Sequence, residues 1–391
     1  MKKAYLSLTA VALCAGAHDH VHAEGMTPKV SLFGTVNAQL ENVQTSGSAT
    51  SAQDKPSRLR VSNVSSDLGV KASIELNDKM TGLFQYVTGV SVDNANANTN
   101  SGMWANAKDV FVGVRFTDVA TIKLGRLTGA ARWNSGTPDF SPSGAGPQDN
   151  QAALSGISGQ SAAAPLFNVR MDNAVGIETA SFKGLSARLY YGANEGKSNA
   201  EVSSGTKLDD ASYSAGLQYV WGPVDTRVSY EVRTDKGTLN NTTGNHTRDT
   251  DMRLGVRYTL PTGTTLALGY DRMTLSDFSA TGAAKSELHK TGWAMGAKQA
   301  FGPHVMYGGL GKAGDLSCKL ANAANCDGKD TGMRQWVVAY NYNFNADMLF
   351  EAYFSQLANQ ARAKYDYDSG GLSPGTGATL RAIGVGLRYA F

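Results

Sequence analysis

The sequence predicts an all-β protein: a transmembrane antiparallel β-barrel of about sixteen strands, with one long connection folded into its lumen. Three observations predict this fold. Apolar and polar residues alternate with period two over most of residues 29–391, and short and long connections alternate along the chain. Residues 127–168 form the longest run without a strand pattern. A structureless segment of this length is uncommon in a compact domain unless it is functional or disordered.

The first residues have the features of a secretory signal peptide. Lys2 and Lys3 give a positively charged start, an apolar stretch runs from Tyr5 to Ala17, and Val21-His22-Ala23 resembles a small-x-small cleavage site. The apolar stretch is too short to span a bilayer, which argues against a membrane anchor. We therefore predict that residues 1–23 are a signal peptide and that residues 24–391 form the exported barrel.

Composition argues against two broad classes of protein, nucleic-acid-binding proteins and helical membrane proteins. Of the 36 basic and 33 acidic residues, Lys2, Lys3 and Asp19 leave with the signal peptide, so 34 basic and 32 acidic residues remain, a net charge of +2. That balance does not indicate a nucleic-acid partner. After the signal no run of 18 apolar residues occurs, which excludes a helical membrane protein. The 44 glycines and plentiful aromatics fit an outer-membrane barrel, and they also fit a secreted β-protein.

Two cysteines remain after the signal peptide, which takes Cys14 with it. Cys318 and Cys326 lie close together in a polar segment of an exported chain, so we predict that they form a disulfide within a loop. The alternative is two free thiols. The segment offers too few ligands for a metal site.

Each predicted strand has one apolar face and one polar face. In residues 110–116, for example, Val110, Val112, Val114 and Phe116 alternate with Phe111, Gly113 and Arg115. Lipid outside and water inside a barrel would produce such two-faced strands. The sixteen segments are 29–42, 57–75, 80–92, 103–116, 119–126, 169–180, 185–194, 210–221, 223–234, 248–259, 264–274, 288–300, 304–312, 332–344, 347–357 and 379–391.

The connections between these strands alternate strictly in length. Short, turn-like ones lie at 76–79, 116–118, 182–184, 221–223, 260–263, 300–303 and 343–347; long, polar ones lie at 43–56, 93–102, 127–168, 195–209, 235–247, 275–287, 313–331 and 359–378. Short periplasmic turns and long external loops produce this alternation in outer-membrane barrels, whereas a β-sandwich has no reason to. A fixed short repeat, as in a β-helix, is absent from the sequence. Aromatic residues cluster at the short-turn rim, where an interfacial girdle belongs: Trp221, Phe301, Phe344 and Phe391.

Four segments of the chain together resemble the Gram-negative general porins, particularly their β-proteobacterial branch. They are KVSLFGTVNAQLE, SSDLGVKASIELNDKMTGLFQY, DVFVGVRFTDVATIKLGRL and the C-terminal GVGLRYAF. The resemblance implies a water-filled outer-membrane channel for passive diffusion of ions and small hydrophilic solutes, without a cofactor. It also implies a homotrimer with an interface near residues 29–92 and the short second loop. It further implies that the barrel-assembly machinery engages the terminal aromatic, Phe391.

The resemblance also implies a constriction site. In that family the third loop folds inward, and its acidic residues face basic residues of the wall. By position, Arg126 and Arg170 match wall arginines, Lys71 matches a wall lysine, and Asp139 in TPDF matches the loop acid; Asp149 is the other acid of this loop. Strand parity adds further inward-facing candidates: Arg115, Lys123, Arg188, Arg253 and Arg257.

Two features complicate this assignment. Arg126 has the outward parity of its strand, so a place in the pore requires a strand end or a bulge that re-aims it. Where the family usually has arginine before Leu-Gly, this chain has Asp67, and the directions of Arg58 and Arg60 stay open. The excess of wall Lys and Arg over loop acids indicates a weak anion preference.

Three other functions compete with the porin interpretation. Only His246, His289 and His304 remain after the signal peptide, and none belongs to a recognisable triad motif, so we predict no enzyme and no metal site. A substrate-specific channel would carry a row of aromatics along its lumen, and a plugged structural or adhesive barrel would conduct nothing. The outward parity of most strand tyrosines favours the general pore.

Overall fold

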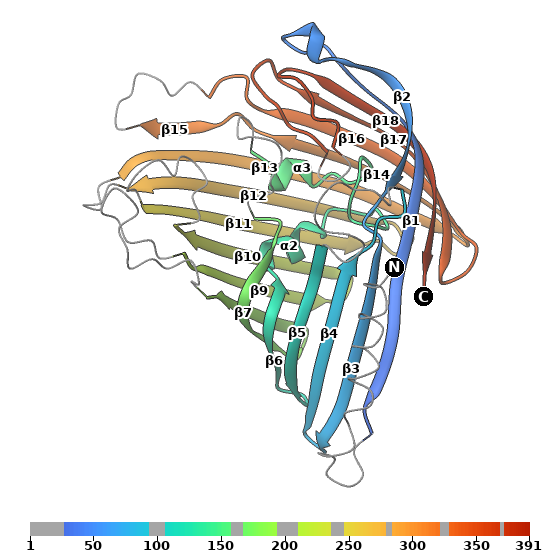
Figure 1. Ribbon diagram of the computed structural model, residues 1–391, viewed down its shortest axis with the longest axis vertical. Helices are drawn as coiled ribbons and strands as arrows, with labels where there is room; N and C mark the ends of the chain where they lie inside the picture. Colours follow the sequence, from blue (N-terminus) through green and yellow to red (C-terminus); the bar gives the residue numbers. More distant parts are fainter. Residues whose placement is uncertain are drawn as a thin grey trace, which may run out of the picture.

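The computed structural model describes residues 27–93, 106–157, 167–193, 210–235, 246–278, 284–320, 328–367 and 371–391. The predicted signal peptide lies outside these residues. The described chain is a closed antiparallel barrel with two short helices inside its wall (Figure 1).

The wall is built from these segments: β1 (Lys29–Ser46), β2 (Lys55–Asn63), β3 (Asp67–Asn77), β4 (Met80–Gly89), β5 (Asn106–Phe116), β6 (Ala120–Thr128), β7 (Arg170–Thr179), β8 (Leu185–Gly192), β9 (Ser212–Trp221), β10 (Val224–Thr234), β11 (His246–Thr259), β12 (Thr265–Phe278), β13 (Ala284–Phe301), β14 (His304–Ala313), β15 (Ser317–Leu320), β16 (Met333–Asn343), β17 (Met348–Asn359) and β18 (Thr379–Ala390). Segments β2 and β3 both pair with β1, and β14 and β15 both pair with β13. Each couple is one wall strand with an interruption, so the barrel has sixteen strands.

Strand β1 closes the barrel. It pairs with β18 on one side, from Thr35↔Ala390 to Ser46↔Thr379, and with β2 and β3 on the other. Two backbone hydrogen bonds complete this seam, from Gly34 N to Phe391 O (3.0 Å) and from Phe391 N to Gly34 O (3.1 Å). Strands β1 and β18, the first and the last of the wall, therefore lie side by side (Figure 1). A closed wall leaves no unpaired strand edge, as the interior of a membrane requires.

The sequence prediction of sixteen antiparallel strands is confirmed, and the predicted segments match the observed ones within a few residues, except that β15 lies in the predicted loop 313–331. Along β1 the odd-numbered residues from Asn37 to Thr45 are buried, while Val36 and Leu40 are exposed on the other face. The same alternation continues around the wall, where outward leucines, valines and tyrosines are exposed because no lipid covers them in the isolated chain. The rim aromatics Trp221, Phe301, Phe344 and Phe391 are all exposed at the short-turn end.

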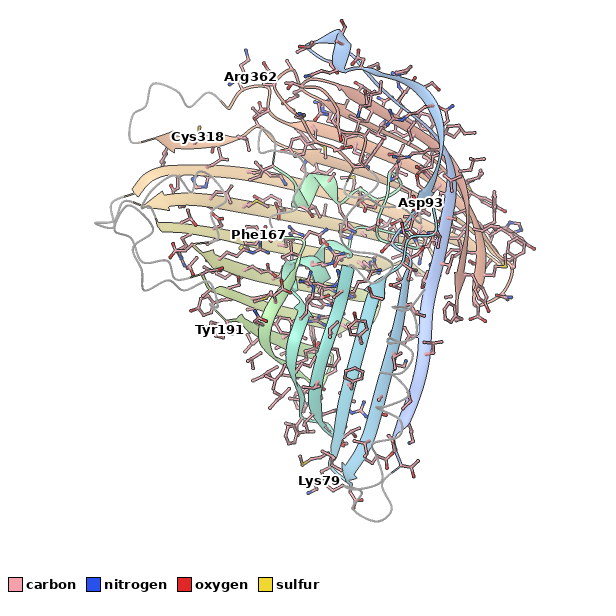
Figure 2. The ribbon with its side chains drawn as sticks, in the orientation of Figure 1. Lys79, Asp93, Phe167, Tyr191, Cys318 and Arg362 are labelled. Atoms are coloured by element: carbon pink, nitrogen blue, oxygen red, sulfur yellow. The ribbon has the colours of Figure 1, made fainter. Side chains whose placement is uncertain are left out.

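The two ends of the barrel differ in their connections. Lys79, in the short turn between β3 and β4, lies at the opposite end of the wall from Cys318 of β15 and from Arg362 in the long connection after β17 (Figure 2). The short turn between β7 and β8 requires a left-handed backbone conformation. Gly184 in this turn has φ +85°, and a Cβ built there would lie 2.1 Å from the Val220 carbonyl oxygen. Only glycine suits that position.

Packing inside the barrel lies between the long connections and the inner wall. The connection after β6 contains α2 (Ala130–Ser135) and α3 (Ala152–Ser155), and Phe167 near its end packs with Met273 and Leu275 of β12. The connection after β17 places Tyr365, Tyr367 and Leu372 against the inner faces of β17, β18 and β1. Among the described residues, no helix is long and apolar enough to cross a membrane.

Candidate channel constriction

The connection after β6, residues 129–169, is called loop 3 below. It leaves the wall at Thr128, turns into the lumen and places α2 against the inner faces of β9 and β10. The backbone N–H of Ala130 donates to Ser214 Oγ (2.8 Å), and that of Ala131 donates to Glu231 Oε1 (2.9 Å). The first turn of a helix has unsatisfied N–H groups, and here the wall supplies their acceptors.

Arg253 on β11 ties both helices of loop 3 to the wall. Its guanidinium donates to the carbonyl oxygens of Ala131 (3.2 Å) and Leu154 (3.3 Å), one in each helix. Its Nε lies 2.9 Å from Asp271 Oδ1 and 3.1 Å from Asp251 Oδ2. All three side chains are essentially buried, so the two carboxylates compensate a charge that would otherwise be costly to bury.

Inward-facing glycines make room for loop 3 on the wall. A Cβ built on Gly292 of β13 would lie 2.2 Å from the carbonyl oxygen of Ala153, and one built on Gly255 of β11 would lie 2.4 Å from Asn134 Oδ1. Any larger residue at either position would displace the loop. The absence of side chains at these points therefore helps to fix where the loop lies.

Aromatic side chains of loop 3 rest on cations of the wall. Trp133 lies between two guanidinium groups, with Arg188 at 3.8 Å and Arg227 at 4.7 Å from its ring centre. Phe140 faces Arg257 (5.2 Å) and Lys298 (5.5 Å), and Phe167 faces Arg233 (4.8 Å). These distances suit cation–π attraction, so the contacts both hold the loop and fix the directions of these five wall cations.

The second half of loop 3 continues around the wall. Gln335 of β16 donates to the carbonyl oxygens of Pro147 and Asp149, Gln148 donates to Glu351 of β17 (3.2 Å), and Asn37 of β1 donates to Ser143. The described part of the loop thus covers the inner wall from β9 round to β1. The inner faces of β3 to β7 form the wall opposite it.

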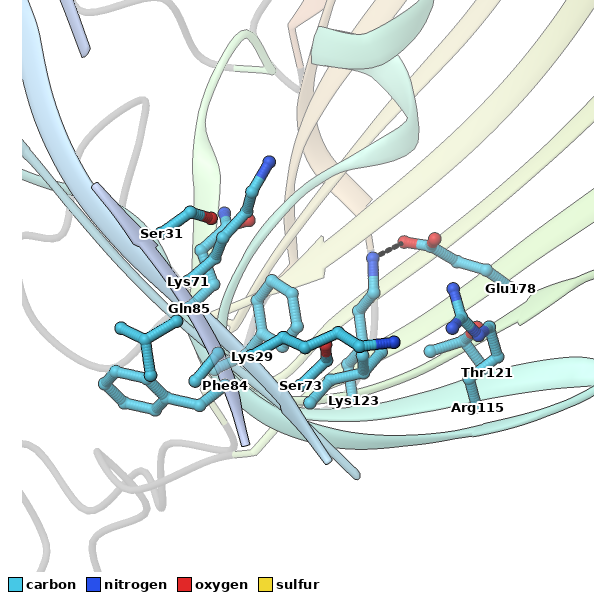
Figure 3. Close-up of a pocket in the computed structure, with 14 residues that line it drawn as sticks. Lys29, Ser31, Lys71, Ser73, Phe84, Gln85, Arg115, Thr121, Lys123 and Glu178 are labelled. Atoms are coloured by element: carbon cyan, nitrogen blue, oxygen red, sulfur yellow. Dashed lines mark hydrogen bonds and ion pairs between the residues drawn. The ribbon is translucent and has the colours of Figure 1, made fainter. Parts of the chain in front are cut away.

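On this opposite wall three of the predicted cations share one recess of about 350 Å³ (Figure 3). They are Lys71 on β3, Arg115 on β5 and Lys123 on β6, and Lys29 lies at the edge of the same recess. Lys123 Nζ lies 2.7 Å from Glu178 Oε1, so its charge is largely compensated. Lys71 lies 5.2 Å from the Phe33 ring centre and Arg115 donates weakly to Thr81 Oγ1 (3.5 Å). Within the described ranges, neither Lys71 nor Arg115 forms an ion pair.

The chain matches the family model described as Gram-negative porin over residues 6–362. It belongs to the Gram-negative porin family. This porin is an outer-membrane channel for passive diffusion, and the resemblance inferred from its sequence is confirmed. A comparison with curated protein sequences gives no match.

Solved structures share the fold of this porin at low sequence identity. The anion-selective porin from Comamonas acidovorans has a TM-score of 0.72 at 17% identity, covering 93% of this chain and 100% of its own. OmpT of Vibrio cholerae in its trimer form has a TM-score of 0.63 at 14% identity, covering 93% and 100%. OmpF of Salmonella typhi, in complex with daunomycin, has a TM-score of 0.62 at 16% identity, covering 95% and 99%.

The two loop acids of this porin do not face open water. Asp139 is buried and accepts hydrogen bonds from Ser141 N (2.9 Å), Ser141 Oγ (2.8 Å) and Gln151 Nε2 (3.3 Å). Burial raises the pKa of Asp139 from its ordinary 3.8 to about 6, against the opposing effect of these hydrogen bonds. Asp149 is also buried and accepts from the backbone N–H of Gln151 (2.8 Å). Both carboxylates therefore brace the loop instead of lining the pore surface, which corrects the expected geometry.

Arg126 and Arg170 also lie apart from the cation recess. Arg126 keeps the outward parity of β6 and pairs with Asp172 of β7. The irregularity in this part of the wall is on β7, where three residue steps match two on β6, so it does not turn Arg126 inward. Arg170 Nε lies 2.7 Å from Asp109 Oδ1 at the base of loop 3. Neither arginine joins the recess that Lys71 and Arg115 share.

The structure also gives the directions of Asp67, Arg58 and Arg60, and two of these residues form ion pairs. Asp67, the departure from the family pattern, faces inward and lies 2.7 Å from Lys108 Nζ. Arg60 also faces inward, with its Nε 2.7 Å from Glu41 Oε2. Arg58 shares this inward parity, since it is the cross-strand partner of the buried Val43, and it is exposed. The reversed charge at Asp67 is therefore compensated locally.

Several site residues were missed by sequence reasoning. Trp133 and Phe140 are aromatic residues in the middle of a polar loop, and the sequence shows this. Their cation partners lie on distant strands, so sequence spacing does not predict them. Arg188, Arg253 and Arg257 were recognised as inward-facing, but their contacts to loop 3 were not. Cys318 takes part in a disulfide, and its predicted partner Cys326 lies outside the described residues. In the described part of the chain, no three His, Cys, Asp or Glu residues are placed to hold a metal ion.

Proposed function

We propose that this porin conducts small hydrophilic anions in preference to cations. The observation that carries the proposal is the placement of charge: Lys71 and Arg115 face the lumen without carboxylate partners, while Asp139 and Asp149 are buried in loop 3. Fixed charges that line a pore raise the local concentration of the opposite ion. A solved relative is named for anion selectivity, but at 17% identity it supports only the fold.

The remaining inner cations strengthen the imbalance. Arg188, Arg257 and Lys298 contact aromatic rings or loop carbonyl groups, and no carboxylate lies within ion-pair distance of them among the described residues. Acids on the same inner face, by contrast, are either paired with cations, such as Asp225 with Arg227 (3.1 Å) and Glu178 with Lys123, or buried against loop 3, as Glu231 and Glu351 are. The accessible lumen therefore carries net positive charge.

The test is the reversal potential of the purified channel in a planar bilayer under a potassium chloride gradient. We expect a chloride preference that weakens or inverts in Lys71→Gln/Arg115→Gln. The matched control is Arg126→Gln/Arg272→Gln, which removes two cations from the outward face and should leave the reversal potential unchanged. Cation preference in the unaltered channel, or an unchanged reversal potential in Lys71→Gln/Arg115→Gln, would refute the proposal.

We infer that the channel is a homotrimer and that transport, rather than catalysis, is its role. One structural relative is solved as a trimer. Apolar side chains on the outward faces of β1 and β2, including Leu32 (61% exposed) and Leu59 (67% exposed), supply a surface that a second copy would cover. Leu59→Ser/Val61→Ser should lower the trimer fraction in native mass spectrometry, while Leu217→Ser/Tyr219→Ser on β9 should not. Single openings instead of triplets in bilayer recordings would contradict the trimer.

A further inference from the structure

Two like charges lie opposite each other on the outward face of the wall. Lys312 of β14 is the cross-strand partner of Arg334 of β16, and both have outward parity, like the exposed Leu310 and Trp336 two residues closer to the short-turn end. Like charges directly opposite in a sheet destabilise it. Neither side chain forms an ion pair with any described residue, so the part of the chain that the structure describes supplies no counter-charge here.

The position of these cations corresponds to the headgroup level of a membrane. On β14 and β16 the outward residues from the short-turn end are apolar or aromatic up to Leu310 and Trp336, and the next outward residue is the cation. Arg272 on β12 and Arg381 on β18 occupy the same place above Tyr270 and Ile383. A cation facing lipid is least costly at the interface, where it meets water and headgroups.

Directly below Lys312 and Arg334 the outward face is hollowed. A groove of about 650 Å³ is lined by Leu266, Leu268, Met295, Leu310, Trp336 and Val338. Its floor is Ala297 paired with Gly308, the smallest residues available, on β13 and β14. The lining is almost wholly apolar, as a hydrocarbon chain requires.

We propose that this groove and the cation pair form one site for a phosphate-bearing lipid of the outer leaflet. The lipid's phosphate would lie between Lys312 Nζ and the Arg334 guanidinium, supplying the missing counter-charge, and an acyl chain would occupy the groove. Guanidinium and ammonium groups are the usual protein partners of phosphate. The long loops follow the same ends of β14 and β16, so this site lies on the external side of the membrane. The proposal is independent of the ion selectivity of the pore.

A second outward groove provides an internal comparison. It has about 560 Å³ and is lined by Val175, Ile177, Leu189, Tyr191, Tyr213 and Tyr230, with Ala215 beside them. The outward cation on the neighbouring strand β6, Arg126, already pairs with Asp172. This groove therefore offers apolar surface without a free cation pair, and it should not select a phosphorylated lipid.

The experiment measures lipid retained on the full-length protein in detergent by native mass spectrometry, titrated with diphosphoryl lipid A or with phosphatidylcholine. Lys312→Gln/Arg334→Gln should weaken binding of the lipid A roughly 30-fold, as expected for loss of two surface cations. Ala297→Phe, which fills the groove, should also weaken it. Ala215→Phe, which fills the second groove, should leave it unchanged.

The outcomes separate the proposal from non-specific adsorption. Equal affinity for phosphatidylcholine, unchanged binding in Lys312→Gln/Arg334→Gln, or equal losses in Ala297→Phe and Ala215→Phe would each overturn it. Displacement of bound lipid A by millimolar inorganic phosphate would also overturn it, because an acyl chain would then contribute nothing. Heat-modifiable migration and unchanged conductance show that each variant is folded.

Discussion

Asp139 shows how burial alters the chemistry of a single loop residue. Its folded-state pKa of about 6 lies above the ordinary 3.8, so the folded chain binds this proton more tightly than the unfolded chain does. The free energy of unfolding is therefore highest, as far as this group is concerned, below about pH 4. It falls as the pH rises from about 4 to about 6, because the unfolded chain releases the proton first. Above that pH, the ionised carboxylate also adds one negative charge to loop 3.

We predict that Asp139→Asn removes this pH dependence. Between pH 4 and pH 7, the free energy of unfolding of the unaltered porin should fall by about 3 kcal/mol more than that of the variant, as followed by thermal unfolding. Asp118→Asn, in an exposed short turn, is the control and should behave like the unaltered protein. Parallel pH profiles for all three proteins would show that Asp139 does not titrate in this range.

Arg253 carries a second prediction at the residue scale. Replacing it by Met leaves Asp251 buried without its cation and Asp271 with only Lys290, at 3.7 Å, and should cost about 3–5 kcal/mol of stability. It also frees two carbonyl groups of loop 3, so current noise in single-channel records should increase. Adding Asp251→Asn, which leaves the pair of Asp271 and Lys290 intact, should recover part of the lost stability; no recovery would mean that packing, not charge, explains the loss.

Among the elements, loop 3 depends on the glycines of the wall. Gly292→Val would place a side chain where the Ala153 carbonyl oxygen now lies, so we expect the loop to shift and the single-channel conductance to change. Ala187→Val, on the outward face of β8, is the control and should conduct like the unaltered channel. Equal conductance in both variants would show that the loop tolerates the added side chain.

The strands could be predicted from sequence because lipid and water impose an alternation that every strand repeats. Both interruptions in the wall, at residues 64–66 and 314–316, were still placed within or beside the right strands. The path of loop 3 could not be predicted, since it depends on glycine gaps and on Arg188 and Arg227 meeting Trp133 across distant strands. Arg126 was assigned to the pore by family position, and its own parity, which argued otherwise, agrees with the structure.

For the whole molecule, the terminal aromatic is part of the closure. The backbone of Phe391 exchanges two hydrogen bonds with Gly34, and its ring lies over that glycine, which has no side chain to obstruct it. Phe391→Ala should therefore lower the yield of heat-modifiable barrel in the outer membrane. Phe344→Ala, at the same rim but away from the seam, should not; equal yields would remove any special role for the terminal ring.

The seam between β1 and β18 also fixes an order of events in time. Hydrogen bonds between these strands join the two ends of the described chain, the longest sequence separation in the barrel, and such contacts form slowly because the intervening chain must be ordered first. Until they form, β1 and β18 are open edges that hydrocarbon cannot solvate. Strand β1, exported first, must wait for strand β18, exported last. The membrane is sealed around this porin only after its whole chain has crossed into the periplasm.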